Sequence, residues 1–316
     1  MQIKSLSLRE SFGRALIKIA KERDDFVVLD ANVAGGTCTN LFEKECPQRF
    51  IQCGISEQNM MGVAAGIASL EKIIPIATTY AVFASMRAIE QIRNSIAYPN
   101  LNAKIAASHV GVDTGPDGAT HQSIEDIAIF RSIPNMVVLA PADHFEMEKT
   151  VREALSYKGP VYIRTGRSPT RVMFDSHYKF EIGKGNVLRG GKDVTIIAVG
   201  VMVYRAVKAA QKLEKERIKT RVIDMCSIKP IDEELIIKAA KETEAIVTAE
   251  DHNKIGGLRS AVAEVITESY PVVQEYVAIN DVFGESGEPD ELAVKHKLTD
   301  EDIYKACLKA IERKNN

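Results

Sequence analysis

The sequence predicts an α/β protein with two domains, each built on a mostly parallel sheet that helices cover on both faces. A length of 316 residues is typical of two domains. Short apolar runs such as 26–29 alternate with stretches whose apolar residues recur at helical spacing, which is the pattern of parallel α/β sheets. The polar, Gly-containing segment 175–192 interrupts this alternation, so we interpret it as a linker between domains at 1–174 and 193–316.

The first series begins with a helix predicted over 7–22, which Ser5 or Ser7 could cap. Strands are predicted at 26–29, 50–53, 73–78, 103–108, 136–140 and 161–163, and further helices at 58–70, 80–96, 123–132 and 143–156. The run 26–29 is apolar throughout, as in a strand that is buried on both faces. Because proline cannot donate to a sheet, Pro75 predicts either a strand end or an edge strand.

The second series repeats this pattern. Strands are predicted at 194–199, 221–223, 245–249 and 273–279, and helices at 202–217, 232–242, 258–269 and 300–313. Thr299 is expected to cap the last helix, whose first turn is acidic, as the helix dipole favours. The segment Glu250-Asp251-His252 superficially resembles a charge-relay set, but no serine elbow accompanies it, and we interpret it as a domain-contact turn.

Composition excludes several classes of protein. Hydrophobic and charged contents of 45% and 27% are ordinary for a globular protein, and a net charge of -2 favours neither nucleic acid nor an anionic membrane as a partner. No apolar run is long enough to span a bilayer, and no signal-peptide core begins the chain. Five scattered cysteines form no CxxC pair and no metal-ligand spacing, which predicts reduced thiols, a cytoplasmic location and no metal site in this chain.

Notable polar and aromatic residues directly follow the predicted strands. They are Asn32, Glu57, Tyr80, His109 and Arg164. Because ligands bind beyond the carboxyl ends of parallel strands, we expect a functional site at this edge of the first sheet. Glu57 also falls where a helix should begin, so the alternative is a carboxylate that only complements the helix dipole.

The segment 108–122, SHVGVDTGPDGATHQ, is the densest polar stretch. Its histidines and aspartates suit hydrogen bonding to hydroxyl groups or proton transfer, although an ordinary surface loop is the alternative. Tyr80 and Phe83 share a helical face and could pack in the core or stack on a heteroaromatic ring. Arg164 and Arg167 could bind an anion such as phosphate, or pair with a local carboxylate.

Several of these segments together resemble the transketolase family. Those similar to its pyrimidine-binding domain are 54–58, 79–87, 108–122 and 132–136, and those similar to its C-terminal domain are 221–224 and 250–257. The family's pyrophosphate-binding domain, with its Gly-Asp-Gly and downstream Asn, has no counterpart here. The chain therefore resembles the C-terminal subunit of a split transketolase. The resemblance implies thiamine diphosphate as cofactor, Mg²⁺ held by a separate N-terminal subunit, an α2β2 assembly, and sugar phosphates as substrates.

The resemblance also implies roles for individual residues. Glu57 matches the glutamate that hydrogen-bonds the cofactor's ring nitrogen N1′, Phe83 matches the aromatic residue that stacks on the pyrimidine, and Tyr80 and Asn32 fall beside the cofactor. Residues implied in contacting the sugar substrate are His109, Asp117, His121, Arg167, Arg164 and Arg9. Glu57, His109 and His121 are the implied catalytic residues. Gly36 stands where the family has a phosphate-binding serine, which leaves the sugar open.

The activity implied is transfer of a two-carbon ketol unit from a ketose phosphate to an aldose phosphate, as in the pentose phosphate pathway. Three alternatives remain open at this point. The first is the β subunit of a 2-oxo acid dehydrogenase, which shares the two-domain layout, and the second is a relative of 1-deoxyxylulose-5-phosphate synthase. The third is a non-catalytic assembly subunit.

Overall fold

Seven strands form the first sheet of the computed structural model, which describes residues 5–316; the first four residues of the predicted first domain lie outside that range. The strand order is β10-β5-β6-β4-β3-β1-β2. The strands span Phe26–Asp30 (β1), Phe50–Gln52 (β2), Ile74–Tyr80 (β3), Lys104–Ser108 (β4), Val137–Leu139 (β5), Val161–Thr165 (β6) and Ser227–Lys229 (β10). All pair in parallel except β10, which runs antiparallel to β5 and comes from the second half of the chain.

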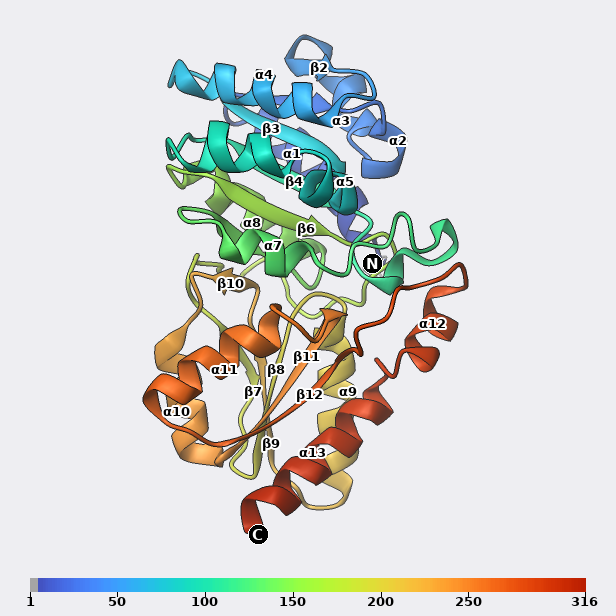
Figure 1. The fold of residues 1–316 in the computed structure, drawn as a ribbon, viewed down its shortest axis with the longest axis vertical. Coiled ribbons are helices and arrows are strands. Elements are labelled where there is room, and N and C mark those ends of the chain that lie inside the picture. Colours follow the sequence, from blue (N-terminus) through green and yellow to red (C-terminus); the bar gives the residue numbers. More distant parts are fainter. Residues whose placement is uncertain (1–4) are drawn as a thin grey trace.

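The helices of the first half cover both faces of this sheet (Figure 1). They are α1 (Leu8–Ala20), α2 (Ala34–Thr37), α3 (Asn40–Glu45), α4 (Glu57–Ser69), α5 (Ala81–Met86), α6 (Ile89–Gln91), α7 (Asp126–Ser132) and α8 (His144–Ser156). Short 3₁₀ turns lie at η1 (Pro47–Arg49) and η3 (Val112–Asp117), and η2 (Ile92–Ala97) is a π-helical turn. Ser7 caps α1 by accepting a hydrogen bond from the Glu10 N–H, which confirms Ser7 rather than Ser5 as the cap.

The predicted helix over 80–96 is wrong as a continuous helix, because α5 ends at Met86 and the next turn is distorted. The Ala88 N–H bonds to the Phe83 carbonyl, five residues back, and the Arg87 carbonyl accepts from the Gln58 side chain. That carbonyl is therefore turned toward the start of α4 instead of continuing a helix. Pro75 is the second residue of β3, which lies between β1 and β4, so the strand end is confirmed and the edge position is wrong.

The remaining strands form a second, five-stranded sheet in the order β12-β11-β8-β9-β7. The strands are β7 (Asn186–Arg189), β8 (Val194–Ala198), β9 (Thr220–Asp224), β11 (Ala245–Asn253) and β12 (Val273–Ile279), and only β7 is antiparallel. The helices are α9 (Met202–Lys215), α10 (Glu233–Thr243), α11 (Leu258–Ser269), α12 (Pro289–Lys295) and α13 (Asp300–Asn315). The α/β class with two mostly parallel sheets is thereby confirmed.

Two details of the second half differ from a simple linker followed by a domain. Strand β7 lies inside the segment 175–192 and pairs with β9. Strand β10 leaves the second half to complete the first sheet. The cap of α13 is as predicted, since Thr299 and Asp302 hydrogen-bond each other's backbone N–H groups in a capping box.

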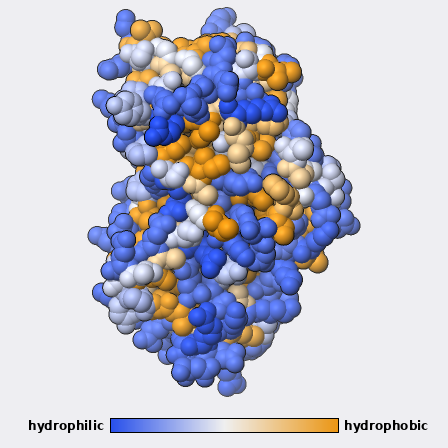
Figure 2. Space-filling model, viewed as in Figure 1, coloured by the Kyte–Doolittle hydropathy of each residue, from blue (hydrophilic) through white to orange (hydrophobic). Residues whose placement is uncertain are grey.

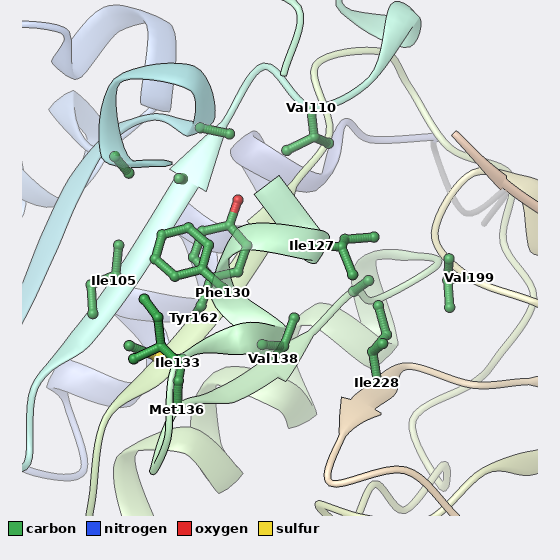
Figure 3. Close-up of a cluster of buried hydrophobic side chains, with 14 of the residues drawn as sticks. Ile105, Val110, Ile127, Phe130, Ile133, Met136, Val138, Tyr162, Val199 and Ile228 are labelled. Atoms are coloured by element: carbon green, nitrogen blue, oxygen red, sulfur yellow. The ribbon is translucent and has the colours of Figure 1, made fainter. Parts of the chain in front are cut away.

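The two halves share a buried apolar core at their junction. Figure 3 shows Phe130, Tyr162 and Val138 of the first half facing the region of Ile228 and Val199 of the second. The Phe130 and Tyr162 rings stack with centroids 3.9 Å apart. This continuous burial fixes the two domains against each other, because separating them would expose apolar surface to water.

Within residues 5–316, no helix combines the length and apolarity that crossing a membrane would require. On the face drawn in Figure 2, hydrophobic residues form separate patches among hydrophilic ones. All five cysteines are free thiols.

Candidate active site

Four rings meet beyond the carboxyl ends of β3 and β4. We call Tyr80, Phe83, His109 and His121 the ring cluster. The Tyr80 centroid lies 3.9 Å from that of His109 and 5.5 Å from that of Phe83, and the His121 ring lies 5.4 Å from Phe83 and 5.7 Å from Tyr80. The sequence analysis predicted all four residues for one site, and the structure brings them together.

Strand register explains why these rings converge. Tyr80, the last residue of β3, pairs with Ser108, the last residue of β4, so His109 emerges beside Tyr80. His109 has a positive φ of 64°, a conformation that non-glycine residues seldom adopt and that is associated with functional sites. The Ser108 hydroxyl lies 2.8 Å from His109 Nδ1 and fixes the orientation of the imidazole.

His109 is a neutral base in this environment. Burial, followed by the positive charges of Arg9 and Arg167 and by His121, lowers the pKa of His109 to about 3. Its Nε2 lies 3.6 Å from Asp117 Oδ2, a contact that would count as an ion pair only with a charged ring. Because burial and two nearby cations oppose protonation, we interpret this contact as one between an uncharged imidazole and a carboxylate.

Asp117 and Arg167 extend the ring cluster toward solvent. Arg167 Nε lies 3.0 Å from Asp117 Oδ2, and the two side chains are 29% and 37% exposed. Their partial exposure leaves both groups able to meet a ligand. The structure therefore places Asp117 and Arg167 next to His109, as the sequence analysis predicted for substrate-binding residues.

Arg9 reaches the same region from the start of α1. Its Nη1 donates to the Gly36 carbonyl at 2.9 Å, while its buried Nε has no hydrogen-bond partner in the described chain. A Cβ at Gly36 would lie 2.1 Å from the Tyr80 hydroxyl oxygen, so Tyr80 fills the space that a side chain at position 36 would need. Gly36, where the family has a serine, thus leaves the space that the Tyr80 hydroxyl occupies.

Glu57 opens α4, and its side chain is only 7% exposed. Its Oε1 accepts from Arg87 Nη1 at 3.0 Å, and the Arg87 guanidinium carbon lies 3.7 Å from the Phe83 ring centroid. Glu57 is therefore joined to the ring cluster through Arg87. Arg87 was not predicted as a site residue: its place one helical turn after Phe83 is consistent with the contact to that ring, but the contact with Glu57 depends on tertiary packing.

Asn32 follows β1 as predicted and has a positive φ of 63°. Its backbone N–H donates to Gln52 Oε1 at 2.8 Å. Within the part of the chain that the structure describes, no contact joins the Asn32 side chain to the ring cluster. Its cofactor-binding role stays a prediction.

The substrate-binding role of Arg164 stays a prediction, and the structure shows Arg164 paired within the chain. Arg164 is 4% exposed, and its Nε and Nη2 donate to Asp126 at 2.7 and 3.0 Å. Burial opposes ionisation of Asp126, but the charge and hydrogen bonds of Arg164 outweigh it and lower the pKa of Asp126. The Tyr162 hydroxyl donates to the same carboxylate. The alternative named for Arg164, an ion pair with a local carboxylate, is the one observed.

Arg164 also donates to the Asp251 carbonyl, and we call Asp126, Tyr162, Arg164 and Asp251 the domain-contact network. The Asp251 carboxylate accepts from the N–H groups of Val112 and Asp113, both at 3.0 Å. The predicted domain contact at 250–252 is confirmed, but the predicted turn is wrong, because these residues belong to β11.

The site thus offers a carboxylate, an aromatic wall, neutral imidazole and two cations on one partly exposed surface. Such groups suit a flat heteroaromatic ring and a hydroxylated anion. Among residues 5–316, no three His, Cys, Asp or Glu side chains gather so as to hold a metal ion.

Comparison with known proteins agrees with the resemblance seen in the sequence. Residues 4–172 match the transketolase pyrimidine-binding domain, and residues 183–303 match the transketolase C-terminal domain. A Methanocaldococcus jannaschii protein provisionally described as a transketolase C-terminal section is 46% identical, with 97% of this chain and 96% of that protein aligned. The 6-deoxy-6-sulfo-D-fructose transketolase subunit of Clostridium sp. strain MSTE9 is 40% identical, with 98% and 95% aligned.

A solved structure described as a split-gene transketolase in an inactive beta4 tetramer has the same fold. It is 48% identical, superposes with a TM-score of 0.91, and the alignment covers 98% of this chain and all of the other. The chain therefore belongs to the transketolase family, with the pyrimidine-binding and C-terminal domains of that family on one polypeptide.

Proposed function

We propose that this chain is one subunit of a split transketolase that depends on thiamine diphosphate and transfers a two-carbon ketol unit between sugars. The observation that carries the proposal is a connected set of contacts. Arg87 joins Glu57 to Phe83, Tyr80 joins Phe83 to His109, and His109 lies beside the Asp117–Arg167 pair. The names of the split-gene structure and of the sulfofructose transketolase subunit favour transketolase over a 2-oxo acid dehydrogenase.

The residues present fit the cofactor's aminopyrimidine. Glu57 is a buried carboxylate at the N-terminus of α4, where it would share a proton with a ring nitrogen of the pyrimidine. Phe83 offers an aromatic face beside it. When bound, thiamine diphosphate supplies the electron sink that makes cleavage of a carbon–carbon bond possible.

The protein's own groups would orient the sugar and move protons. His109 keeps its ring neutral far below physiological pH, so it is suited to hydrogen-bond a hydroxyl group of the sugar as an uncharged imidazole. The His121 ring lies edge-on to Phe83 and Tyr80, and we expect it to hydrogen-bond a second oxygen of the sugar. Asp117 would accept from a hydroxyl group while Arg167 holds its carboxylate in place.

The anionic end of the sugar would meet Arg9 and Arg167. The positive charges of both guanidinium groups lower the pKa of His109. The buried Nε–H of Arg9 has no hydrogen-bond partner among residues 5–316. Two cations suit a phosphate or a sulfonate equally. Because one relative is named for 6-deoxy-6-sulfo-D-fructose, a sulfonated sugar is the alternative to a sugar phosphate as substrate. We propose a ketose phosphate as donor and an aldose phosphate as acceptor, as in the pentose phosphate pathway.

A second subunit would complete the site. The proposed partner carries the pyrophosphate-binding domain and the Mg²⁺ ligands, in a heterotetramer with two copies of each subunit. The exposed face of α4 includes Gly62 and Gly66, where an added Cβ would meet no atom within 4 Å. A partner could therefore approach the helix that carries Glu57 closely.

Reconstitution tests the proposal. The chain is mixed with thiamine diphosphate and Mg²⁺, with and without the partner subunit, and given xylulose 5-phosphate and ribose 5-phosphate; a parallel reaction uses 6-deoxy-6-sulfo-D-fructose as donor. We expect turnover only with the partner, and loss of turnover in the complex that carries Glu57→Ala. Full activity of the isolated chain would refute the divided site, and wild-type turnover by the Glu57→Ala complex would refute the role of Glu57.

A further inference from the structure

Arg87 contacts both residues to which we assign the cofactor's pyrimidine. It donates to the Glu57 carboxylate at 3.0 Å, and its guanidinium carbon lies 3.7 Å from the centre of the Phe83 ring. We propose that Arg87 is a placeholder: it neutralises Glu57 and covers Phe83 in the unloaded subunit, and cofactor binding displaces it. This inference rests on the proposed function, because it concerns the same site.

Phe83 is partly exposed, and three groups lie against its ring. The Tyr80 ring is stacked at 5.5 Å with an interplanar angle of 30°, and His121 approaches edge-on at 68°. The guanidinium of Arg87 lies over the ring at a stacking distance. A pyrimidine that stacks on the Phe83 face covered by Arg87 therefore has to exchange places with the guanidinium group.

Arg87 is the group best able to leave. Its side chain is 51% exposed, whereas the facing Glu57 side chain is 7% exposed. The fold holds Arg87 by its backbone, because the Gln58 side-chain amide donates to the Arg87 carbonyl at 3.0 Å. The side chain can thus swing into solvent without opening the junction between α4 and α5.

The placeholder also accounts for the stability of a buried carboxylate. Glu57 would be costly to keep ionised and unpaired at 7% exposure, and Arg87 supplies the compensating charge. When a ring nitrogen takes over the carboxylate, the guanidinium is no longer required. Binding then includes the cost of releasing Arg87, which weakens the apparent affinity by the fraction of molecules in which the site is free.

Calorimetric titration of the reconstituted complex tests this inference. Thiamine diphosphate is titrated, with Mg²⁺ present, into the wild-type, Arg87→Met, Arg87→Lys and Arg93→Met complexes. Arg93 is the matched control, since it is an exposed arginine on the next turn that donates only to Asn94. We expect Arg87→Met to bind the cofactor about tenfold more tightly, Arg87→Lys to fall between it and wild type, and Arg93→Met to match wild type.

Thermal melting of the isolated chain gives a readout that needs no cofactor. We expect Arg87→Met to lower the melting temperature, because Glu57 loses its partner, and we expect the added Glu57→Gln change to restore it. Unchanged or weaker cofactor binding by a folded Arg87→Met complex would overturn the placeholder. If the wild-type complex binds no thiamine diphosphate, the proposed function fails. In that case the melting series still decides whether Arg87 and Glu57 form a pair.

Discussion

The ring cluster and the domain-contact network lie at the same edge of the first sheet, yet they have opposite surroundings. In the domain-contact network, Asp126 and Arg164 are 0% and 4% exposed and satisfy each other within the chain. Beside the ring cluster, Arg167, Asp117 and Arg87 keep between 29% and 51% of their side chains exposed. The two arginines near the end of β6 thus differ: Arg164 is buried against the Asp126 carboxylate, whereas Arg167 stays partly exposed and able to meet a ligand.

The largest expected effect breaks the domain-contact network. Arg164→Met leaves the Asp126 carboxylate buried without its cation, and we expect a loss of about 3–5 kcal/mol in the free energy of unfolding. Urea denaturation followed by circular dichroism measures this loss. The matched control is Arg167→Met, whose partly exposed pair with Asp117 should contribute about 1 kcal/mol or less. Equal denaturation midpoints for the two variants would contradict the distinction between the two regions.

The second prediction makes the same substitution at two glycines. Gly111 has a φ of +66°, and a Cβ there would lie 2.1 Å from the Asp251 carboxylate, so Gly111→Ala should cost about 1–3 kcal/mol from backbone strain alone. At Gly36 the three atoms nearest to the added methyl group belong to the outer end of the Tyr80 side chain, so the Tyr80 ring would have to shift within the ring cluster. We therefore expect Gly36→Ala to keep its denaturation midpoint but to lower kcat/KM of the reconstituted enzyme about tenfold.

Denaturation and steady-state kinetics on the same preparations separate the two outcomes. The two variants sharpen the comparison because Gly111→Ala should lose stability and keep activity, whereas Gly36→Ala should keep stability and lose activity. A Gly36→Ala enzyme that turns over at the wild-type rate would show that the position of Tyr80 does not matter to the reaction.

Hydrophobic pattern predicted most of the fold, and strand ends predicted Tyr80 and His109 of the ring cluster. The roles of Phe83 and His121 came from the resemblance to the transketolase family. The continuous apolar run 26–29 and the mostly apolar run 194–199 predicted strands directly, because strands buried on both faces tolerate few polar residues. Strand β10 could not be read this way. It has three residues, Ser227–Lys229, and its place in the first sheet depends on a tertiary contact with β5 that no local pattern records.

In the site, too, the local sequence predicted some residues, whereas others depend on tertiary contacts. His109 and Tyr80 were found because strand ends converge, and register then placed them side by side. Sequence alone left two readings for Arg164, because only the fold shows that Asp126 lies within reach. Arg87 was missed because its importance arises from two contacts, with Glu57 on α4 and with Phe83 on α5, that require the packed structure.

The last prediction concerns a second buried pair between the domains, whose effect depends on pH. Asp224, at the end of β9, is 1% exposed, and neither of its carboxylate oxygens has a hydrogen-bond donor in the described chain. Facing it are Glu146 and Asp143 at the start of α8, together with Tyr178 and Cys226. Glu146 already accepts from the Ala142 N–H and the Tyr178 hydroxyl, so we infer that Asp224 is the group of the pair that keeps the proton.

Burial, followed by the charge of Glu146 and the hydrogen bond to it, raises the pKa of Asp224 well above its usual range. The folded state then holds a proton that the unfolded state releases above about pH 4. The stability contributed by this proton is complete below that value and is lost as pH rises toward the folded-state pKa, by at most about 1.4 kcal/mol per pH unit. Asp224→Asn keeps a donor to Glu146 but does not titrate, so stability measured by urea denaturation at pH 5, 7 and 9 should fall less steeply than in wild type. Asp24→Asn, on the exposed surface, should follow the wild-type curve. Parallel curves for wild type and Asp224→Asn would show that no proton is shared there, and the junction would then hold a charged carboxylate pair with no cation to offset it.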